Sequence, residues 1–589
     1  MTAVFIANRG EIALRIVRTC RDLGLQSIVG YSSADVQTPA VRLADTSVCI
    51  GDAPARASYL NIESIIRAAT SSGATMVHPG CGFLAENADF AEAVAQAGLT
   101  FIGPTPTAMR DLGDKRKARE LADGVGIPIV PGLILDGELS PSEGDLERIG
   151  LPFLVKAAHG GGGRGMRIVR TMDDLAEALD QARRESSAAF GKNDIFIESL
   201  VEHARHVEVQ VFGDSHGNVV DFGTRDCTIQ RRHQKLIEEA PAPFLSRDVT
   251  ERIRDSARRL AEHVGYVNAG TAEFLVNPVT GEFFFLEMNT RLQVEHSITE
   301  MIYGADLVAL QIRVALGESL GLDQRDITPR GHAIEIRVNA ENPHDDFRPH
   351  SGMLTHLSAP QGPGVRCDFG FESGSEISPH YDSLLGKIIA HAPTREAAIA
   401  VMARAIQELV VDGLPTTAQF TKTVMKHLRF QEGNHWTTMV DEGVIDLSEV
   451  AHWSENEFAG LLPPQQQPAA ATQVQLLIIQ TTSGPVSLFV PVLGHATTAL
   501  AADGVSVTST TSASRTAQTS GPIAPMAGSL LRYTVNVGDL VTAETTIAFI
   551  ESMKMETAIS AGIAGTVKRL LVEVGAAVKR GSVLAVIEA

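Results

Sequence analysis

The end of the chain contains an internal repeat, and a repeat within so short a segment leaves few folds open. Gly528–Glu551 and Gly565–Glu588 align without gaps and are identical at nine of twenty-four positions. Both copies alternate apolar and polar residues, as half-buried strands do. Two similar hairpin units can bury each other's apolar faces, so residues 522–589 are predicted to form a small all-β flattened barrel with approximate two-fold symmetry. Lys554 lies between the copies and is expected on an exposed hairpin turn.

The first hundred residues follow a different pattern, in which short apolar runs alternate with amphipathic segments. Strands are expected at Val4–Ala7, Ser27–Ser32 and Thr75–His78. Apolar residues at helical spacing follow the first strand and recur over Ile62–Thr70. This β-α-β alternation predicts a parallel, doubly wound α/β domain.

The stretch that most strongly suggests chemistry runs from residue 287 to residue 295, where polar side chains recur at every second position. In an extended strand they would share one face, opposite an apolar face. A turn-forming segment at 277–281 would bring Glu273 near this strand. Two close carboxylates and an amide oxygen suit magnesium, and an arginine with a further glutamate would supply an anion clamp and a general base. The predicted polar face consists of Glu287, Asn289, Arg291, Gln293 and Glu295.

A glycine-rich segment at 160–165 also suggests phosphate binding. It separates the expected strand Phe153–Ala158 from another expected strand at 166–169. No Gly-Lys-Ser/Thr follows it, so it is not a Walker A loop, and no helix follows, so it is not a dinucleotide fingerprint. A flap of this kind can close over phosphates with its backbone N–H groups, while Lys156 would neutralise phosphate charge.

Four cations and a histidine lie within the eleven residues from Arg225 to Lys235. The whole chain has 70 acidic and 50 basic residues and a net charge of −20, which argues against general affinity for nucleic acid or anionic membranes. A basic cluster in so acidic a chain therefore predicts a local anion-binding pocket. In the later expected strand 333–341, Arg337 would lie on a polar face that can complete the same site.

Composition also indicates linkers and cellular location. Residues 463–468 and 506–520 have linker composition, and Gln473–Val492 between them is compatible with two strands. The five cysteines include no CxxC pair, so neither a disulfide framework nor a zinc site is expected. The N-terminus lacks a signal-peptide pattern, and no stretch approaches the ~20 apolar residues of a membrane span. We therefore expect a cytoplasmic protein.

The motifs, taken in order, resemble those of biotin-dependent carboxylases. The MKM sequence around Lys554 is similar to the biotin attachment site of the carboxyl-carrier domain. A carboxylase and its carrier on one chain resemble the α subunit of bacterial acyl-CoA carboxylases, over roughly residues 3–439 and 521–589. The motifs that look like the biotin carboxylase component, an ATP-grasp enzyme, are FIANRGEIALRI, HPGCGFLAEN, KAAHGGGGRGM, RDCTIQRRHQK and EMNTRLQVEH.

The resemblance implies ATP- and bicarbonate-dependent carboxylation of biotin attached to Lys554, with Mg²⁺ or Mn²⁺. Glu295 would act as the base on bicarbonate, so that its oxygen attacks the γ-phosphate and forms carboxyphosphate, and Arg337 would bind biotin and stabilise its ureido enolate. The metal ligands would be Glu273, Glu287 and Asn289, and bicarbonate would bind Lys235, Arg291, Gln293 and Val294. The ATP site would comprise Lys115, Lys156, Gly161, Gly162, Gly163, Gly165, Met166, Glu198, Val201, His206, Gln230 and His233.

The resemblance also implies a multidomain α/β and α+β chain. Its expected parts are a biotin carboxylase N-terminal domain (1–112), an ATP-grasp domain (113–328), a mixed α+β C-terminal carboxylase domain (329–445), a linker with a small β element (446–521) and a lipoyl-like biotinyl barrel (522–589). A carboxyltransferase needs a full domain of ~100–200 residues, and the linker is too short for one. A separate carboxyltransferase β subunit is therefore expected in a hetero-oligomer, with biotin protein ligase as a further partner.

Three residues depart from the family pattern: Cys81 replaces the usual tyrosine, Val201 the common leucine, and Ser552 the commoner alanine before MKM. Two other functions remain as alternatives. A different ATP-grasp carboxylate–amine ligase is disfavoured by the MKM hairpin, and a carrier or scaffold subunit with an inactive ATP-grasp domain is disfavoured by the intact acidic and basic residues. Lipoate on Lys554 is a further alternative, against which the flanking methionines argue.

Overall fold

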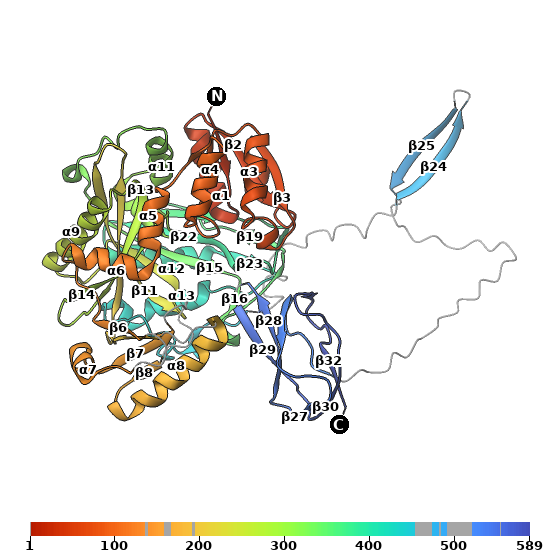
Figure 1. The fold of residues 1–589 in the computed structure, drawn as a ribbon. Helices are drawn as coiled ribbons and strands as arrows, with labels where there is room; N and C mark the ends of the chain where they lie inside the picture. The colour runs from red at the N-terminus through yellow and green to blue at the C-terminus, as the bar shows by residue number, and fades with distance from the viewer. Residues whose placement is uncertain are drawn as a thin grey trace.

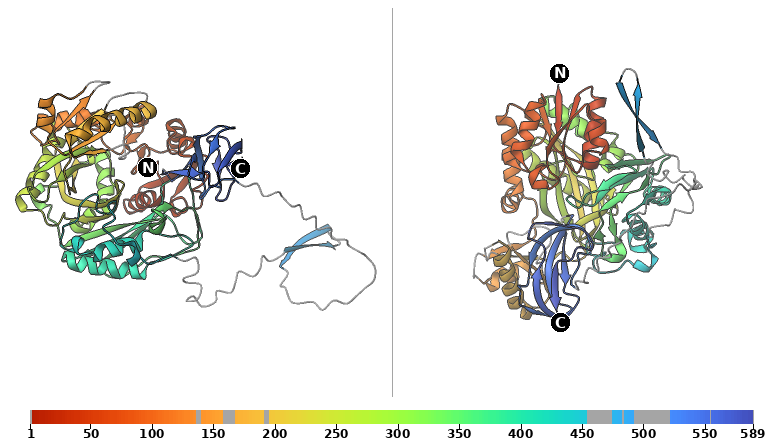
Figure 2. Two further views of the ribbon diagram at one scale, coloured as in Figure 1. Left: turned by 90° about the horizontal axis from the view of Figure 1, so that it is seen from below. Right: turned by 90° about the vertical axis from the view of Figure 1, so that its right-hand side faces the viewer.

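The computed structural model describes residues 2–135, 140–157, 167–190, 195–453, 474–481, 484–491, 521–553 and 555–588. The chain up to residue 453 forms one body of helices and sheets, and a small all-β domain lies against it (Figures 1 and 2). This arrangement confirms the multidomain α/β and α+β fold. Among the described helices, none has both the length and the apolar character required to cross a membrane.

The N-terminal domain contains a five-stranded parallel sheet in the order β3-β2-β1-β4-β5. Val4 and Ile6 of β1 pack in one apolar cluster with α1, whereas Phe5 packs in another with α3 and α4. Both faces of the sheet are therefore covered, which confirms the doubly wound prediction. The elements are β1 (Ala3–Ile6), α1 (Gly10–Asp22), β2 (Gln26–Ser32), α2 (Pro39–Leu43), β3 (Thr46–Gly51), α3 (Ile62–Ser71), β4 (Met76–His78), α4 (Ala88–Gln96), β5 (Thr100–Phe101) and α5 (Pro106–Gly113).

A smaller antiparallel sheet follows, in the order β6-β9-β7-β8. Strands β7 and β8 pair with Phe153 opposite Val169, so the glycine-rich segment does connect two adjacent strands. Phe153 and Val155 pack against α8 in the core of this unit. The elements are α6 (Lys115–Gly124), β6 (Gly132–Leu135), α7 (Glu143–Ile149), β7 (Phe153–Ala157), β8 (Arg167–Val169), α8 (Leu175–Phe190) and β9 (Ile195–Ser199).

The largest sheet has eight strands in the order β14-β13-β10-β11-β12-β15-β22-β20, and its neighbouring strands are antiparallel. Its strands are β10 (Arg205–Gly213), β11 (Val219–Arg231), β12 (Gln234–Ala240), β13 (Asn268–Val276), β14 (Phe283–Asn289), β15 (His332–Asn339), β20 (Val365–Phe369) and β22 (Leu384–Ala392). The pairing of β12 with β15 carries the sheet across the boundary expected near residue 328. The second and third domains therefore share one sheet.

Helices and short strands complete this part of the molecule. Apolar residues of α12 and α13 pack with alternate residues of β15 and β22, including Ile336 and Ile388, in one large cluster. The helices are α9 (Arg247–His263), α10 (His296–Tyr303), α11 (Leu307–Ala315), α12 (Arg395–Glu408), α13 (Ala418–Lys426) and α14 (Leu428–Gln431). Three two-stranded sheets pair β16 (Glu341–Asn342) with β17 (Arg348–Pro349), β18 (Gly352–Leu354) with β21 (Ser375–Ile377), and β19 (His356–Ser358) with β23 (Val410–Asp412).

The predicted strand over 287–295 is wrong beyond Asn289, where β14 ends. The backbone N–H of Thr290 donates to Glu86 of the N-terminal domain instead of a neighbouring strand, and Leu292 is fully buried in a cluster with α1 residues. Glu295 is then the residue immediately before α10, and its side chain makes no capping hydrogen bond to the described helix. The hairpin before β14 is as expected, because the Asn277 and Gly281 N–H groups donate within the turn and Glu273 lies opposite Glu287.

The C-terminal domain has the predicted two-fold barrel. Its strands are β26 (Gly528–Tyr533), β27 (Leu540–Val541), β28 (Thr546–Ser552), β29 (Met555–Ser560), β30 (Gly565–Leu570), β31 (Ala577–Val578) and β32 (Ala585–Glu588), in two sheets ordered β29-β28-β26-β31 and β27-β30-β32. Gly528 pairs with Val578, and the equivalent Gly565 pairs with Val541. The short strand of each copy thus pairs with the first strand of the other, which explains the repeat.

The segment between the carboxyl end of the body and the barrel contains the two strands predicted there. β24 (Val474–Thr481) and β25 (Gly484–Pro491) form an antiparallel hairpin of their own. The two stretches read as linkers, 463–468 and 506–520, lie outside the described residues.

Candidate active site

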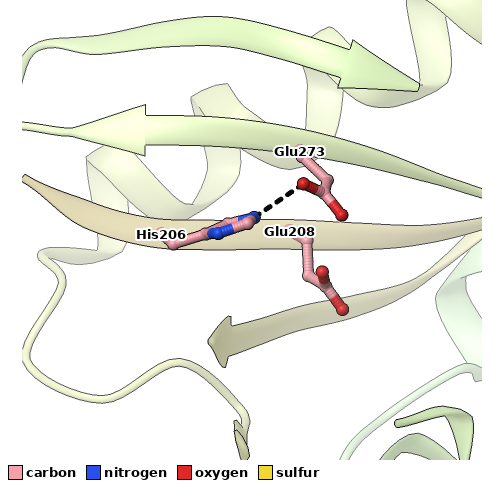
Figure 3. Close-up of side chains that lie close together, drawn as sticks. All are labelled: His206, Glu208 and Glu273. Atoms are coloured by element: carbon pink, nitrogen blue, oxygen red, sulfur yellow. Dashed lines mark ion pairs between the residues drawn. The ribbon is translucent and has the colours of Figure 1, made fainter. Parts of the chain in front are cut away.

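Three side chains on neighbouring strands form the centre of the site. Figure 3 shows His206 and Glu208 on β10 beside Glu273 on β13. His206 Nε2 lies 2.8 Å from a Glu273 oxygen, and all three side chains are buried. Burial lowers the pKa of His206, but the adjacent Glu273 carboxylate outweighs burial and the net pKa is raised. The site therefore favours an imidazolium paired with a carboxylate.

Lys235, near the start of β12, is the central cation of this group. Burial lowers its pKa, but the surrounding carboxylates dominate and hold the pKa well above the ordinary value. Lys235 is therefore a charged ammonium group, which can donate a hydrogen bond to a bound anion in place of one of its carboxylate partners. Its Nζ donates to Glu295 Oε1 (2.6 Å), Glu208 Oε2 (2.7 Å), Glu273 Oε1 (3.1 Å) and Gln293 Oε1 (3.2 Å).

Glu295 lies between two cations. Lys235 contacts one of its oxygens, and Arg337 Nη2 on β15 donates to the other at 3.0 Å. Burial raises the pKa of Glu295, but Lys235 and Arg337 outweigh it and hold the pKa well below its usual range. The Arg337 Nε also donates to Glu238 at 2.6 Å. Arg337 thus joins the site from the third domain, and Glu295 is ionised.

The residues expected to bind metal lie together at the β13–β14 edge. Glu273 and Glu287 are cross-strand neighbours, and Asn289 Nδ2 donates to Glu273 at 2.8 Å. Burial raises the pKa of Glu273, but Lys235 and His206 outweigh it and keep the carboxyl ionised. Lys115 Nζ lies 3.1 Å from Glu287 Oε2. Two carboxylates and an amide oxygen fit a hard divalent cation.

The residues expected to hold ATP fall into two groups. Lys156 on β7 donates to Glu198 on β9 at 2.5 Å, and its ammonium lies 5.0 Å from the centre of the Phe196 ring. Val201 follows β9 and is partly buried. His233 lies in the β11–β12 turn with its backbone in the left-handed region (φ 63°), and burial lowers its pKa. Gln230, at the end of β11, pairs in register with Lys235.

Arg291 connects the site to the N-terminal domain. Its Nε donates to Glu86 at 3.0 Å and its Nη2 to Asn289 Oδ1 at 3.2 Å. Gln293 Nε2 donates to Glu273 at 2.8 Å, and the Val294 carbonyl accepts a hydrogen bond from Lys387. The loop after β14 therefore brings these residues to the same place that a continuous strand was expected to reach.

The prediction that the basic cluster at 225–235 forms one anion pocket is wrong for Arg231 and Arg232. Arg231 and Arg232 both pair with Asp346 of the third domain. Arg225 is fully buried and paired with Glu208, which also pairs with Lys235. Arg231 and Arg232 are therefore engaged outside the site, whereas Lys235 and Arg225 both reach its carboxylate Glu208.

Two of the three departures from the family pattern, Cys81 and Ser552, have different surroundings. Cys81 is partly buried, and its carbonyl accepts a hydrogen bond from Asn8 at 2.8 Å. Burial raises the pKa of its thiol to about 12, so Cys81 stays protonated. Ser552 is buried at the end of β28.

Several expected residues cannot be placed in this way, since Gly161, Gly162, Gly163, Gly165, Met166 and Lys554 lie outside the described residues. The hairpin that carries Lys554 is described on both sides. Met553 is 4% exposed and belongs to the apolar cluster of the third domain. Its backbone N–H donates to the Pro379 carbonyl at 3.1 Å. The β28–β29 turn thus contacts the larger body, against which the barrel lies in Figure 1.

Sequence reasoning missed three carboxylates of the site. Glu208 pairs with Lys235 and Arg225, Glu238 pairs with Arg337, and Glu86 pairs with Arg291. Glu208 could have been found, because His206 and Glu208 alternate with Val207 and Val209 and so share one strand face. Glu86 lies in a distant loop with no such pattern.

The comparisons with known proteins extend over 99% of the chain. Four family models match in order: "Biotin carboxylase, N-terminal domain" at residues 1–109, "Carbamoyl-phosphate synthase L chain, ATP binding domain" at 114–323, "Biotin carboxylase C-terminal domain" at 335–442 and "Biotin-requiring enzyme" at 523–587. Biotin carboxylase of Nostoc sp. is 48% identical over 442 residues, which are 74% of this chain and 98% of that protein. The biotin-dependent acyl-coenzyme A carboxylase alpha3 subunit of Mycobacterium leprae is 40% identical over 600 residues, or 99% of this chain and 98% of its own.

Solved structures show the same likeness over the first three domains. The biotin carboxylase–β,γ-ATP complex of Campylobacter jejuni has a TM-score of 0.70 and 42% identity, with 75% of this chain and 98% of that chain covered. The biotin carboxylase domain of the Hydrogenobacter thermophilus 2-oxoglutarate carboxylase, solved with MgADP, ADP and bicarbonate, has a TM-score of 0.70 and 40% identity, with 77% and 99% covered.

Proposed function

This chain belongs to the biotin carboxylase family, with a biotin-requiring domain on the same polypeptide as in acyl-CoA carboxylase α subunits, and from that premise we propose how it works. It uses ATP and bicarbonate to carboxylate biotin on Lys554 of its own carrier domain. A separate carboxyltransferase subunit then transfers the carboxyl group to an acyl-CoA. The observation that carries this proposal is the contact of Met553 with Pro379, because it brings the carrier hairpin to the carboxylase.

We assign bicarbonate to the cations around Glu295. Lys235, Arg291, Gln293 and the Val294 backbone would hold the anion, and Glu295 would take its proton. Bicarbonate would compete with Glu295 for the Lys235 ammonium, which donates to Glu295 at 2.6 Å. Losing part of that ion pair raises the pKa of Glu295 toward a range where it accepts a proton more readily. The deprotonated oxygen then attacks the γ-phosphate of ATP, the bond from that phosphorus to the β–γ bridging oxygen breaks, and carboxyphosphate and ADP form.

ATP would lie between the small sheet and the large one. Lys115, Lys156 and the glycine-rich flap would neutralise and enclose the phosphates, and Glu198, Val201, His206, Gln230 and His233 would contact the nucleotide. Glu273, Glu287 and Asn289 would bind Mg²⁺ or Mn²⁺, which supplies positive charge beside the transferring phosphoryl group. In such reactions positioning and electrostatics provide most of the catalysis.

Arg337 is proposed to bind the ring of biotin. Its guanidinium already donates to Glu238 and Glu295, so it is fixed on β15 with its charge directed at the site. Attached biotin supplies the nitrogen that accepts the carboxyl group. Arg337 would offset negative charge on the ring while that bond forms.

We propose functional units at 1–112, 113–328, 329–445, 446–521 and 522–589, and a cytoplasmic location. Biotin protein ligase would attach biotin at Lys554. The 446–521 segment would link carboxylase and carrier, with the β24–β25 hairpin as the candidate docking element for the carboxyltransferase.

The first test concerns the partner. The purified chain is expected to hydrolyse ATP in a bicarbonate- and biotin-dependent reaction but to form no carboxylated CoA product. The segment between carboxylase and carrier has no room for a further domain of ~100–200 residues. Incorporation of labelled bicarbonate into acyl-CoA should begin only when the carboxyltransferase subunit is added. Carboxylated CoA formed by the homogeneous chain alone would contradict the proposal.

The second test concerns carrier docking. Met553→Asp places a charge where a buried methionine packs, and full burial of such a side chain is worth ~1.5–3 kcal/mol, or roughly tenfold or more in docking. Carboxylation of attached biotin, normalised to biotin content, should slow by about that factor, while turnover with free biotin stays normal. Val537→Asp is the matched control, since Val537 is a 61% exposed carrier residue. Equal losses in both assays would assign Met553 a purely structural role.

A further inference from the structure

Lys387 is a fully buried cation on β22 that the reaction just described does not use. It is 0% exposed and lies opposite Arg337 on β15 and Asp368 on β20. Since residues in register across a sheet project from the same face, Lys387 lies on the Arg337 side of the sheet, which faces the site. Its neighbour Ile388 belongs to the apolar cluster on the opposite face.

The ammonium of Lys387 contacts the loop that carries the catalytic residues. Its Nζ donates a hydrogen bond to the backbone carbonyl of Val294. That carbonyl and the N–H of Glu295 belong to one planar peptide unit. Holding the carbonyl therefore fixes the direction in which Glu295 leaves the loop, between Lys235 and Arg337.

The carboxylates around Lys387 are placed as counter-charges and not as close partners. The nearest, Glu335, lies 3.8 Å away and is itself fully buried. Among the described residues, neither side-chain oxygen of Glu335 has a hydrogen-bond partner, nor has Oε2 of Glu11, a buried residue of α1. Burial raises the pKa of Glu11 to about 7.

The same surroundings keep Lys387 charged. Burial lowers its pKa, but Glu335, Glu11 and Asp368 outweigh burial and raise the net pKa. These carboxylates come from β15, α1 and β20, while the cations Arg337 and Arg366 and the ring of His296 also face this region. The only close acceptor that the charged amine has among the described residues is thus the Val294 carbonyl.

We propose that Lys387 is a positioning residue for biotin carboxylation: its hydrogen bond to the Val294 carbonyl holds the Gln293–Glu295 turn in the orientation that binds and deprotonates bicarbonate. The inference rests on the proposed role of Glu295. It also makes the N-terminal domain part of the catalytic geometry, because Glu11 contributes to the charge that keeps Lys387 protonated.

The test replaces Lys387 with methionine, which keeps most of the side-chain length but removes the donor. Misplacement of a catalytic group by about 1 Å can cost ~10²-fold, so we expect kcat/KM for bicarbonate to fall by about that factor. The KM for MgATP should stay unchanged, because no ATP-site residue touches Lys387 in the described structure. The measurement is bicarbonate- and biotin-dependent ATP turnover by the full chain. The wild-type chain in the same assay tests the proposed function itself.

Two further variants separate positioning from loss of a buried charge. Lys387→Met/Glu335→Gln removes the nearest counter-charge as well, so it should regain thermal stability but keep the bicarbonate defect. Arg395→Met removes a buried cation that pairs with Glu239 and binds the Phe430 and Gln431 carbonyls away from the site, so it should lower stability with normal bicarbonate kinetics. Recovery of bicarbonate kinetics in the double variant, or a parallel rise in the KM for MgATP, would overturn the proposal.

Discussion

Glu295→Gln is expected to slow bicarbonate-dependent ATP turnover by ~10²–10⁴-fold, the usual cost of losing a general base. The glutamine keeps the side-chain size and can still accept a hydrogen bond from Lys235 or Arg337, which contact the two oxygens at 2.6 and 3.0 Å. Nucleotide binding should therefore persist, since only the proton acceptor is removed. The measurement is steady-state turnover at saturating bicarbonate and free biotin, with nucleotide affinity determined separately by calorimetry.

The control for this experiment is Glu239→Gln. Glu239 lies on β12, is buried like Glu295, and pairs with Arg395 and His332 instead of the site cations. Its loss should lower the melting temperature with little change in kcat. Near-normal turnover by Glu295→Gln would mean that another group deprotonates bicarbonate, and a similar fall in both variants would mean that the assay reports stability.

Lys554→Arg is expected to abolish attachment of biotin altogether. The guanidinium keeps the positive charge but does not form the amide through which biotin is linked to a lysine amine. The other carrier lysines, Lys568 and Lys579, lie on or beside β30 and β31 and not on the hairpin between the repeats. Streptavidin blotting and intact-protein mass, after co-expression with a biotin protein ligase, measure the result.

Lys568→Arg serves as the matched control and should remain fully labelled, since Lys568 is half exposed and faces Glu588 on the barrel surface. Turnover with free biotin should be normal in both variants, because neither lysine belongs to the carboxylase site. Streptavidin labelling that persists in Lys554→Arg would assign the attachment site to a different lysine.

Features set by local pattern could be predicted from the sequence. The repeat predicted the barrel, and pairs such as Gly528 with Val578 and Gly565 with Val541 explain why both copies are needed. The polar alternation of 287–295 identified residues that do come together, although the strand ends at Asn289. Alternating polar and apolar residues predict which side chains share a face only where the backbone is extended. After Asn289 the strand ends, and Leu292 packs against the N-terminal domain instead.

Other parts of the site depend on contacts between distant segments. The role of Lys235 follows from carboxylates on β10, β13 and the loop after β14, and no spacing in the sequence shows that these strands are neighbours. Conversely, the sequence predicted that Arg231 and Arg232 belong to an anion-binding pocket, whereas in the structure both pair with Asp346. Composition gives the sign of a charge cluster, but the partner of each charge depends on the fold.

The shared eight-stranded sheet has a consequence for how the carboxylase part unfolds. Because β12 pairs with β15, strands from both sides of residue 328 depend on one hydrogen-bonded ladder. Ending the chain at that point would leave β12 as a long unpaired edge, which is a template for intermolecular pairing and aggregation. The ATP-binding and C-terminal regions therefore constitute a single cooperative unit, and evolution can exchange the carrier domain far more freely than either half of this sheet.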